Sequence, residues 1–301
     1  LIIILSASGV NATAKNVILM ISDGLGMNGW EAAKLSGSNM VYDGYEGTKV
    51  HFYGMTTYML NADGTPQGYD AGQMWSDFNY TKGNDDYTAF TDSAAAATAM
   101  YAGKKTYQGA IGVDQDQKPV TSYFEIAAAQ GKATGAVSSV EMSHATPAAV
   151  AAHNVSRNNY ADIANEMIYN SQLDVIMGAG PGHATEKYIG GPSTLADIKD
   201  ADGANGFTYI HTPEEFKALA NGGAAAPEKV IGLADTTYTL GNEYWPHEND
   251  ESLVPRLETM TKGALNVLST NLDGFALMVE GGAVDWENHG NRFDTMLIEH
   301  R

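Results

Sequence analysis

Short runs of apolar residues recur along this chain and alternate with stretches whose apolar residues have helical spacing. The first run, residues 17–21, is continuous and bounded by polar residues, which is typical of a parallel strand buried on both faces. This alternation predicts an α/β fold, in which a large, mostly parallel sheet carries helices on both faces. The sequence predicts further strands at 133–139, 173–177, 229–233 and 275–280, helices at 94–101, 122–130, 159–170, 258–268 and 293–299, and one more helix after the capping box Thr212-Pro213-Glu214-Glu215.

Two parts of the chain depart from this alternation. Residues 36–88 are rich in Gly, Asn, Asp and Tyr, so we expect a loop-rich insertion there, with one candidate strand at 51–60. Residues 1–14 begin with an apolar run and end in Ala-Thr-Ala, which predicts the remnant of a secretory signal peptide; a first core strand is the alternative. The apolar run is too short to span a membrane. We expect residues 15–301 to form a single domain.

Charge and composition narrow the function. The 36 acidic and 17 basic residues give a net charge of −19, which argues against nucleic-acid binding because that function needs a basic face. Divalent cations would offset part of this charge, and any phosphate site must create its own local positive field. The chain has no cysteine, so disulfides and thiolate metal sites are excluded. Any bound zinc must therefore be held by histidine and carboxylate side chains.

A serine stands at the head of an alanine-rich run, in Thr91-Asp92-Ser93-Ala94 and the residues that follow. Alanine is the best helix former, so Asp92 or Ser93 is a natural N-cap of the helix predicted there. The free amide groups and the dipole at such an end also favour an anion. Ser93 is therefore a candidate nucleophile directed at phosphate, although a serine in this position can simply cap a buried helix.

Two other stretches add candidate ligands. Asp23 follows the first buried strand, at the end of the sheet where α/β proteins place ligands, and glycines beside it allow a tight turn. Asp285 and His289 are four residues apart, so on a helix they share one face, and both suit zinc. Taken alone, each of these patterns is also common in ordinary turns and caps.

Taken together and in this order, residues 16–27, 91–100, 137–157 and 275–289 resemble the alkaline phosphatase family closely, over most of the chain from about Lys15 onward. The resemblance implies a catalytic domain with two zinc ions and one magnesium ion. In the family's pattern Ser93 matches the nucleophile and Arg157 matches the phosphate clamp. Asp285 and His289 match ligands of the first zinc, Asp23 matches the ligand that bridges the second zinc and magnesium, and Thr146 and Glu280 match magnesium ligands. Asp92, His144 and Trp286 match residues behind these ligands.

The implied reaction is the hydrolysis of phosphate monoesters through a phosphoserine intermediate. The resemblance also implies a secreted or periplasmic protein and, as is usual in the family, a homodimer. His144 and Trp286 depart from the best-known bacterial form, which has an acidic and a basic residue there; other members carry His and Trp. The family also supplies an Asp-His pair and a further His downstream, so we expect the domain to be incomplete at its C-terminus. The alternatives are a phosphodiesterase-type relative, which often uses threonine as nucleophile, and a non-catalytic metal- or phosphate-binding remnant.

Overall fold

The fold is given by a computed structural model, which describes residues 2–3, 14–37, 54–55, 57–61, 63–67, 90–180, 186–200, 203–222, 225–236 and 253–300. Most of the predicted insertion at 36–88 lies outside these ranges. Of the strand predicted at 51–60, the described residues contain only an isolated bridge at Leu60, so the prediction is wrong for that part. Among the described residues we find no helix with the length and apolar character needed to cross a membrane.

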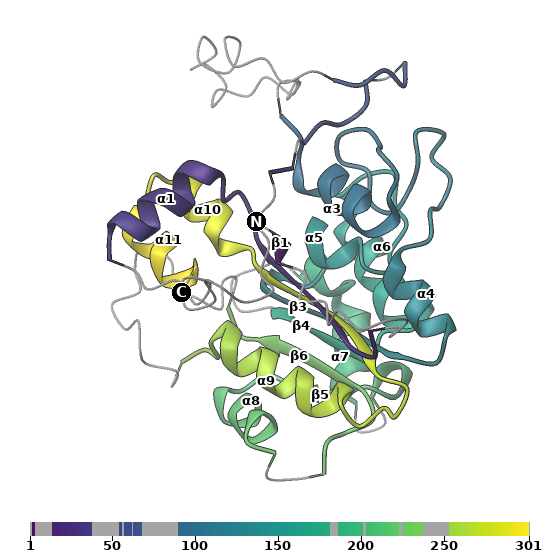
Figure 1. The fold of residues 1–301 in the computed structure, drawn as a ribbon. Helices are drawn as coiled ribbons and strands as arrows, with labels where there is room; N and C mark the ends of the chain where they lie inside the picture. The colour runs from purple at the N-terminus through teal and green to yellow at the C-terminus, as the bar shows by residue number, and fades with distance from the viewer. Residues whose placement is uncertain are drawn as a thin grey trace.

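One open sheet forms the centre of the molecule (Figure 1). Its strands lie in the order β1-β2-β7-β3-β4-β6-β5. Every neighbouring pair from β2 to β5 is parallel, and β1 alone runs antiparallel, to β2. The mostly parallel sheet that the sequence predicted is therefore confirmed. The strands are β1 (Ile2–Ile3), β2 (Val17–Ser22), β3 (Ala133–Glu141), β4 (Val175–Ala179), β5 (Thr208–Ile210), β6 (Val230–Ala234) and β7 (Phe275–Gly281).

Helices cover both faces of this sheet. In Figure 1, α3, α4, α5 and α6 lie on one side of it, whereas α8 and α9 lie on the other. The helices are α1 (Met27–Leu35), α3 (Ser93–Ala102), α4 (Tyr123–Ala129), α5 (Ala145–Ala148), α6 (Tyr160–Asn165), α7 (Pro192–Lys199), α8 (Pro213–Ala220), α9 (Leu257–Leu268), α10 (Ala283–His289) and α11 (Phe293–His300), with a π-helical turn η3 (Glu166–Asn170) and 3₁₀ turns η4 (Glu186–Ile189) and η5 (Ala204–Gly206).

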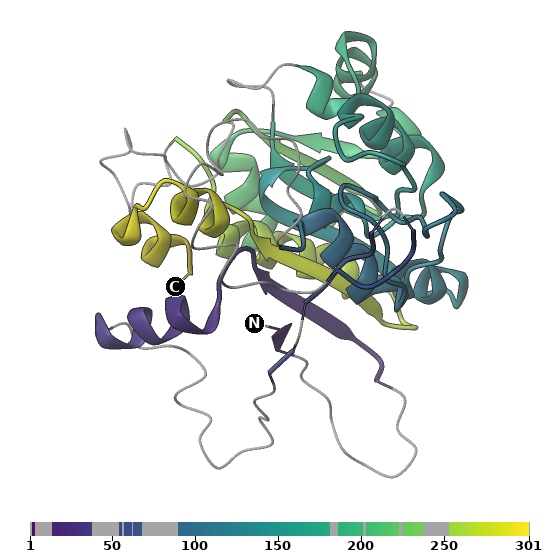
Figure 2. The same ribbon diagram turned by 90° about the horizontal axis from the view of Figure 1, so that it is seen from above.

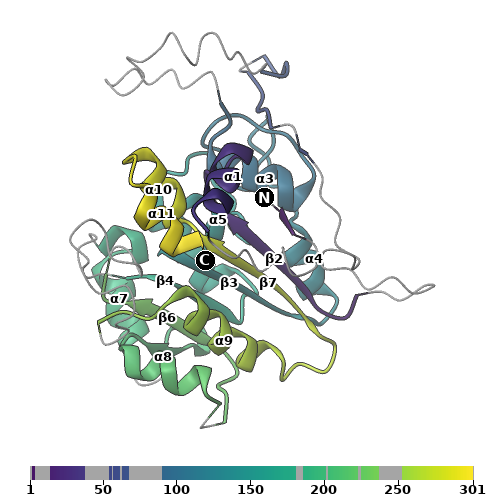
Figure 3. The same cartoon turned by 60° about the vertical axis from the view of Figure 1, so that its left-hand side comes forward.

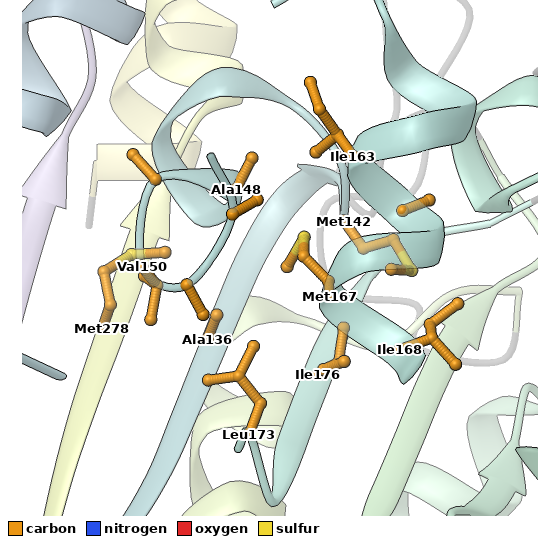
Figure 4. Close-up of a cluster of buried hydrophobic side chains, with 14 of the residues drawn as sticks. Ala136, Met142, Ala148, Val150, Ile163, Met167, Ile168, Leu173, Ile176 and Met278 are labelled. Atoms are coloured by element: carbon orange, nitrogen blue, oxygen red, sulfur yellow. The ribbon is translucent and has the colours of Figure 1, made fainter. Parts of the chain in front are cut away.

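The strands contribute to two hydrophobic cores because successive side chains point to opposite faces. On β3, Ala136 joins the core beneath α3 to α6, while Val137 joins the core beneath α8 and α9. Figure 4 shows the first core, where Ile163 and Met167 pack toward the strands. Burial on both faces explains why these strands appear in the sequence as continuous apolar runs rather than as alternating ones.

A third, smaller cluster joins α1 to the last two helices. Leu25 and Ala33 pack with Val284, Met296 and Leu297. Figures 2 and 3 show α1, α10 and α11 grouped together at one end of the sheet, although α1 is separated from the other two by most of the chain. This cluster fixes α10 beside the turn that follows β2.

The predicted elements lie close to their observed positions. The capping boxes at Ser122 and Thr212 are both formed, and each starts a helix. The helix predicted at 159–170 changes at Glu166 from α-helix to a π-helical turn. Residues 2–3 form the two-residue strand β1, in line with the strand alternative for the N-terminal run. The sequence did not predict helices α1 and α7 or strand β5.

Candidate active site

Two acidic residues meet at the carboxyl ends of neighbouring strands. β2 and β7 are parallel, with Ile21 opposite Glu280 and Ser22 opposite Gly281. Asp23 comes directly after β2, and its backbone N–H donates to the Gly281 carbonyl at 3.3 Å. Asp23 and Glu280, which are far apart in sequence, therefore lie at the same edge of the sheet. This is the edge at which open α/β sheets place ligands.

Ser93 is the first residue of α3, and Asp92 is the N-cap. The Asp92 side chain accepts a hydrogen bond of 3.1 Å from the backbone N–H of Ala95, as an N-cap should. Because Asp92 caps the helix, the Ser93 hydroxyl is available for another partner. It donates to Oδ2 of Asp23 at 2.9 Å. The serine that could have been a simple cap instead points at the acidic edge of the sheet.

Arg157 is held beside Ser93 by two side chains. Its Nη1 donates to Oδ2 of Asp92 at 3.1 Å, and its Nη2 lies 3.3 Å from Nε2 of His144. The backbone N–H of Arg157 donates to the Gly109 carbonyl at 2.7 Å, and the Gly109 N–H lies 3.2 Å from both carboxylate oxygens of Asp92. These bonds fix the position of the guanidinium group next to the N-terminus of α3.

His144 is buried in its neutral form. Burial lowers the pKa of its imidazole to about 3, and the positive charge of Arg157 acts in the same direction. A neutral ring can accept a hydrogen bond from the guanidinium group, which a protonated ring could not do. The ring also packs edge-on against Trp286, with centroids 5.7 Å apart. His144 therefore contacts both Arg157 and Trp286, and the role of His144 and Trp286 behind metal ligands stays a prediction.

The helix α10 presents Asp285 and His289 on one face, where His289 Nε2 lies 3.5 Å from Asp285 Oδ2. Asp285 also closely approaches Gly24, which has a φ of +64°. A Cβ atom at Gly24 would lie only 2.2 Å from Oδ1 of Asp285. Only glycine can therefore occupy this turn while Asp285 stays in place, which explains the Asp-Gly pair after β2.

Glu280 is completely buried. Its Oε2 accepts a hydrogen bond of 2.5 Å from the Ser138 hydroxyl on the neighbouring strand β3. The Thr146 side chain is a second hydrogen-bonding neighbour, which lowers the pKa of Glu280, whereas Oε1 has no partner with good hydrogen-bond geometry. Thr146 is also buried and lies in the short helix α5. Its backbone carbonyl accepts a hydrogen bond of 3.2 Å from the Tyr101 hydroxyl. Ser138 was not among the site residues predicted from the sequence. The signal was present, since a serine in the middle of a buried strand needs a polar partner.

Burial and a neighbouring negative charge raise the pKa values of Asp23 and Glu280. Burial, and then the charge of Asp285, raise the pKa of Asp23 to about 6. Burial and the charge of Asp23 raise the pKa of Glu280 to about 8. Removing water from a carboxylate and adding a like charge both disfavour the ionised form. A positive charge stabilises the ionised form of such a pair, and the charge of Arg157 lowers both pKa values.

The side chains at this edge of the sheet include groups that can bind metal ions. Asp23, Glu280 and the Thr146 hydroxyl offer the oxygen ligands that magnesium prefers, and the unpartnered Oε1 of Glu280 is an open ligand position. Asp285 and His289 offer a carboxylate and an imidazole, which suit zinc. In the described ranges, however, no group of three His, Asp or Glu side chains comes close enough to hold a metal ion. The ligand chemistry fits, and the described ligand sets are incomplete.

Comparison with known proteins decides the family. The sequence model of the family "Alkaline phosphatase" matches residues 14–300. The chain belongs to the alkaline phosphatase family. The resemblance that the motifs indicated is therefore confirmed over nearly the whole chain.

Several alkaline phosphatases are similar in sequence. Alkaline phosphatase 4 of Bacillus subtilis (strain 168) is 34% identical over 285 residues, covering 93% of this chain and 54% of that protein. Alkaline phosphatase of Escherichia coli (strain K12) is 31% identical over 316 residues, covering 92% of this chain and 62% of that protein. The chain thus spans little more than half the length of the relatives it matches.

The fold is also that of solved alkaline phosphatases. The cold-active enzyme of Shewanella sp. matches with a TM-score of 0.65 at 29% identity, covering 94% of this chain and 60% of that one. The enzyme of the Antarctic bacterium TAB5 matches with a TM-score of 0.64 at 28% identity, covering 95% and 70%. A variant of the TAB5 enzyme was solved with Mg bound in its M3 site.

Proposed function

We propose that this protein hydrolyses phosphate monoesters, with Ser93 as the nucleophile. The observation that carries this proposal is the position of the Ser93 hydroxyl, which donates to Asp23 and lies beside the guanidinium group that Asp92 anchors. Family membership supports the same chemistry. A serine nucleophile favours a monoesterase over the diesterase relatives, which often use threonine.

The reaction would proceed in two displacements. The Ser93 Oγ–H proton is directed toward Oδ2 of Asp23, so the oxygen lone pairs are free to attack the phosphorus. A bond forms between Oγ and phosphorus as the bond from phosphorus to the ester oxygen breaks. The Oγ–H proton is lost toward Asp23, and the ester oxygen leaves with its electron pair and takes up one proton to give the alcohol. Water then attacks the phosphoserine, which releases inorganic phosphate and restores the Ser93 hydroxyl.

The phosphoryl oxygens would be held by Arg157 and by the N-terminus of α3. A guanidinium group can donate two parallel hydrogen bonds to phosphate, a geometry that lysine cannot reproduce. Free backbone N–H groups in the first turn of the ten-residue helix α3 add a favourable dipole. Asp92 orients Arg157 from the side away from the substrate, and His144 does the same without adding charge.

We further propose that Asp23, Thr146 and Glu280 hold magnesium, that Asp285 and His289 hold a first zinc ion, and that Asp23 also contacts a second zinc. Bound divalent cations would supply the positive charge that offsets the phosphate and the developing charge on its leaving group. This role is consistent with the raised pKa values of Asp23 and Glu280, because a bound cation favours the ionised form of a buried carboxyl group.

The test uses the whole protein, prepared with zinc and magnesium. We expect hydrolysis of p-nitrophenyl phosphate, much slower hydrolysis of bis(p-nitrophenyl) phosphate, and a phosphorylated peptide that contains Ser93 when the reaction is quenched in acid. Chelation should abolish turnover, and zinc with magnesium should restore it. Full turnover after exhaustive chelation, or a preference for the diester, would overturn the proposal.

A further inference from the structure

The helix α10 has two faces of opposite character. Asp285 and His289 share one face, where the His289 side chain is 61% exposed. Glu287 is two residues from each of them, so it lies about 160° around the helix from both. Its side chain is only 4% exposed. A glutamate is almost never buried to this degree unless its charge is paired. The candidate zinc ligands thus lie on the front of the helix, and a buried carboxylate lies on its back.

Arg292 and Thr295 hold this carboxylate from the segment that follows α10. Nε of Arg292 donates to Oε2 of Glu287 at 2.7 Å, and Nη2 donates to Oε1 at 3.2 Å. These two bonds are the planar fork that a guanidinium group forms with a carboxylate. The Thr295 hydroxyl, on α11, also donates to Oε2. Both oxygens of Glu287 therefore have partners, and the side chain is fixed in one orientation.

The same pair shapes the turn between α10 and α11. The backbone N–H of Arg292 donates to the Glu287 carbonyl at 2.9 Å, so the two residues are joined through main chain and side chain. Asn291, between them, has a φ of +52°. The guanidinium group lies against Gly290, where an added Cβ would be 2.9 Å from Cζ of Arg292. Since His289 immediately precedes Gly290, the geometry of this turn decides how α10 ends and where the histidine points.

The start of α10 is fixed by other contacts. The Ala283 N–H donates to the Ser139 hydroxyl on β3 at 3.1 Å, and Asp285 lies against Gly24. Near the end of α10, Asn288 donates to the Gly24 carbonyl at 3.5 Å, which is long for a hydrogen bond. Figure 3 shows α11 lying along α10 at this end of the sheet. The forked ion pair is thus the strongest of these contacts at the end of α10.

The two candidate ligands are already spaced for one zinc ion. Nε2 of His289 and Oδ2 of Asp285 lie 3.5 Å apart. In a tetrahedral site, ligand atoms about 2.1 Å from zinc lie about 3.4 Å from each other. Ligands that are in place before the metal arrives bind it more tightly, because less conformational freedom is lost on binding. Whatever holds the end of α10 therefore contributes to zinc affinity.

We propose that the ion pair of Glu287 and Arg292 positions His289 beside Asp285 and so sets the affinity of the site for zinc. This inference rests on the proposed zinc site of Asp285 and His289. Glu287 and Arg292 are positioning residues, which act through the backbone of α10 and its following turn and touch neither zinc nor substrate.

The first experiment measures the zinc affinity of the whole protein by competition with a chromophoric chelator. Asp285→Asn identifies the zinc ion concerned, as the one that this variant loses. We expect Glu287→Gln and Arg292→Lys each to bind that zinc about tenfold more weakly, an effect typical of losing a group that supports a metal ligand. Arg292→Lys keeps the charge near Glu287 and removes only the fork, so it avoids an unpaired buried carboxylate.

The double variant Glu287→Gln/Arg292→Lys should lose no more affinity than either single variant, because the first change already breaks the pair. Glu258→Gln is the matched control, since it breaks the exposed pair of Glu258 and Lys262 on α9, and it should keep the wild-type affinity. Wild-type affinity in both single variants, or losses that add in the double variant, would overturn the inference.

The second experiment separates positioning from stability. Val267→Ala removes buried side-chain atoms from the core beneath α8 and α9, and we expect it to lower the free energy of unfolding in urea while zinc affinity stays unchanged. If Val267→Ala and Glu287→Gln lost zinc affinity in proportion to stability, the pair would support only the fold. If Asp285→Asn kept all the zinc of the wild type, the proposed zinc site itself would be wrong, and the inference would fall with it.

Discussion

The Ser93 hydroxyl donates a hydrogen bond of 2.9 Å to Oδ2 of Asp23, although 70 residues separate them in the sequence. Asp23 is placed by β2, and Ser93 by the N-cap of α3. Two independent elements therefore converge on one pair of oxygen atoms. Neither element requires this contact for its own stability, since Asp92 already caps the helix.

Ser93→Ala should remove the nucleophile while leaving the fold intact, because the hydroxyl is not the helix cap. We expect turnover of p-nitrophenyl phosphate to fall by about 10³-fold or more, as when other enzymes lose their nucleophile. The acid-stable phosphoprotein should disappear as well. Ser36→Ala, which removes a hydroxyl at the end of α1, should keep both activities. Phosphoserine that persists in Ser93→Ala would show that another residue is the nucleophile.

The strands and the order of the motifs could be predicted because they depend on local sequence. Continuous apolar runs indicate strands buried on both faces, and capping boxes mark helix starts. The partners of Arg157 could not be predicted, since the contact with His144 depends on how α5 is placed after β3. The bond from Ser138 to Glu280 depends in the same way on the neighbouring positions of β3 and β7.

Asp92 has two separable roles, as the cap of α3 and as the anchor of Arg157. Asp92→Ala removes both, and we expect the free energy of unfolding to fall by about 1 kcal/mol through the lost cap alone. Asp92→Asn keeps the capping oxygen and removes the charge that faces Arg157, so its loss should be smaller. Urea unfolding of the three proteins measures this order. Equal losses in the two variants would contradict a capping role.

Gly24 is required both by its backbone conformation and by its contact with Asp285. Gly24→Ala places a residue with a Cβ at φ +64°, which costs about 1–2 kcal/mol, and also forces Asp285 to move. Gly37→Ala is a matched control, because Gly37 has a φ of +78° and no atom within 4 Å of an added Cβ. We expect Gly24→Ala to lose more unfolding free energy than Gly37→Ala in urea titrations, and to lose zinc affinity as Asp285 shifts. Similar losses in both variants would show that backbone strain accounts for the whole effect.

The raised pKa of the His153 imidazole predicts how the stability of the folded protein changes with pH. Its ring nitrogens lie 3.5 Å from Glu125 and 3.3 Å from Glu166, and these contacts raise the pKa of the imidazole from 6.5 to about 10 in the folded protein. Between these values the folded state binds a proton that the unfolded state has released, so stability falls as the pH rises. The contribution of His153 is therefore complete below about pH 6.5 and is lost as the pH approaches 10.

The measurement is urea unfolding of the wild type and His153→Gln between pH 6 and pH 10. We expect a large difference in unfolding free energy at pH 6 that shrinks steadily toward pH 10. In Glu166→Gln, which removes one of the two carboxylates, the imidazole pKa followed by NMR should move back toward 6.5 because one stabilising charge is gone. A stability difference that stays constant across this range would mean that His153 contributes through packing, and that its contacts with Glu125 and Glu166 do not depend on its charge.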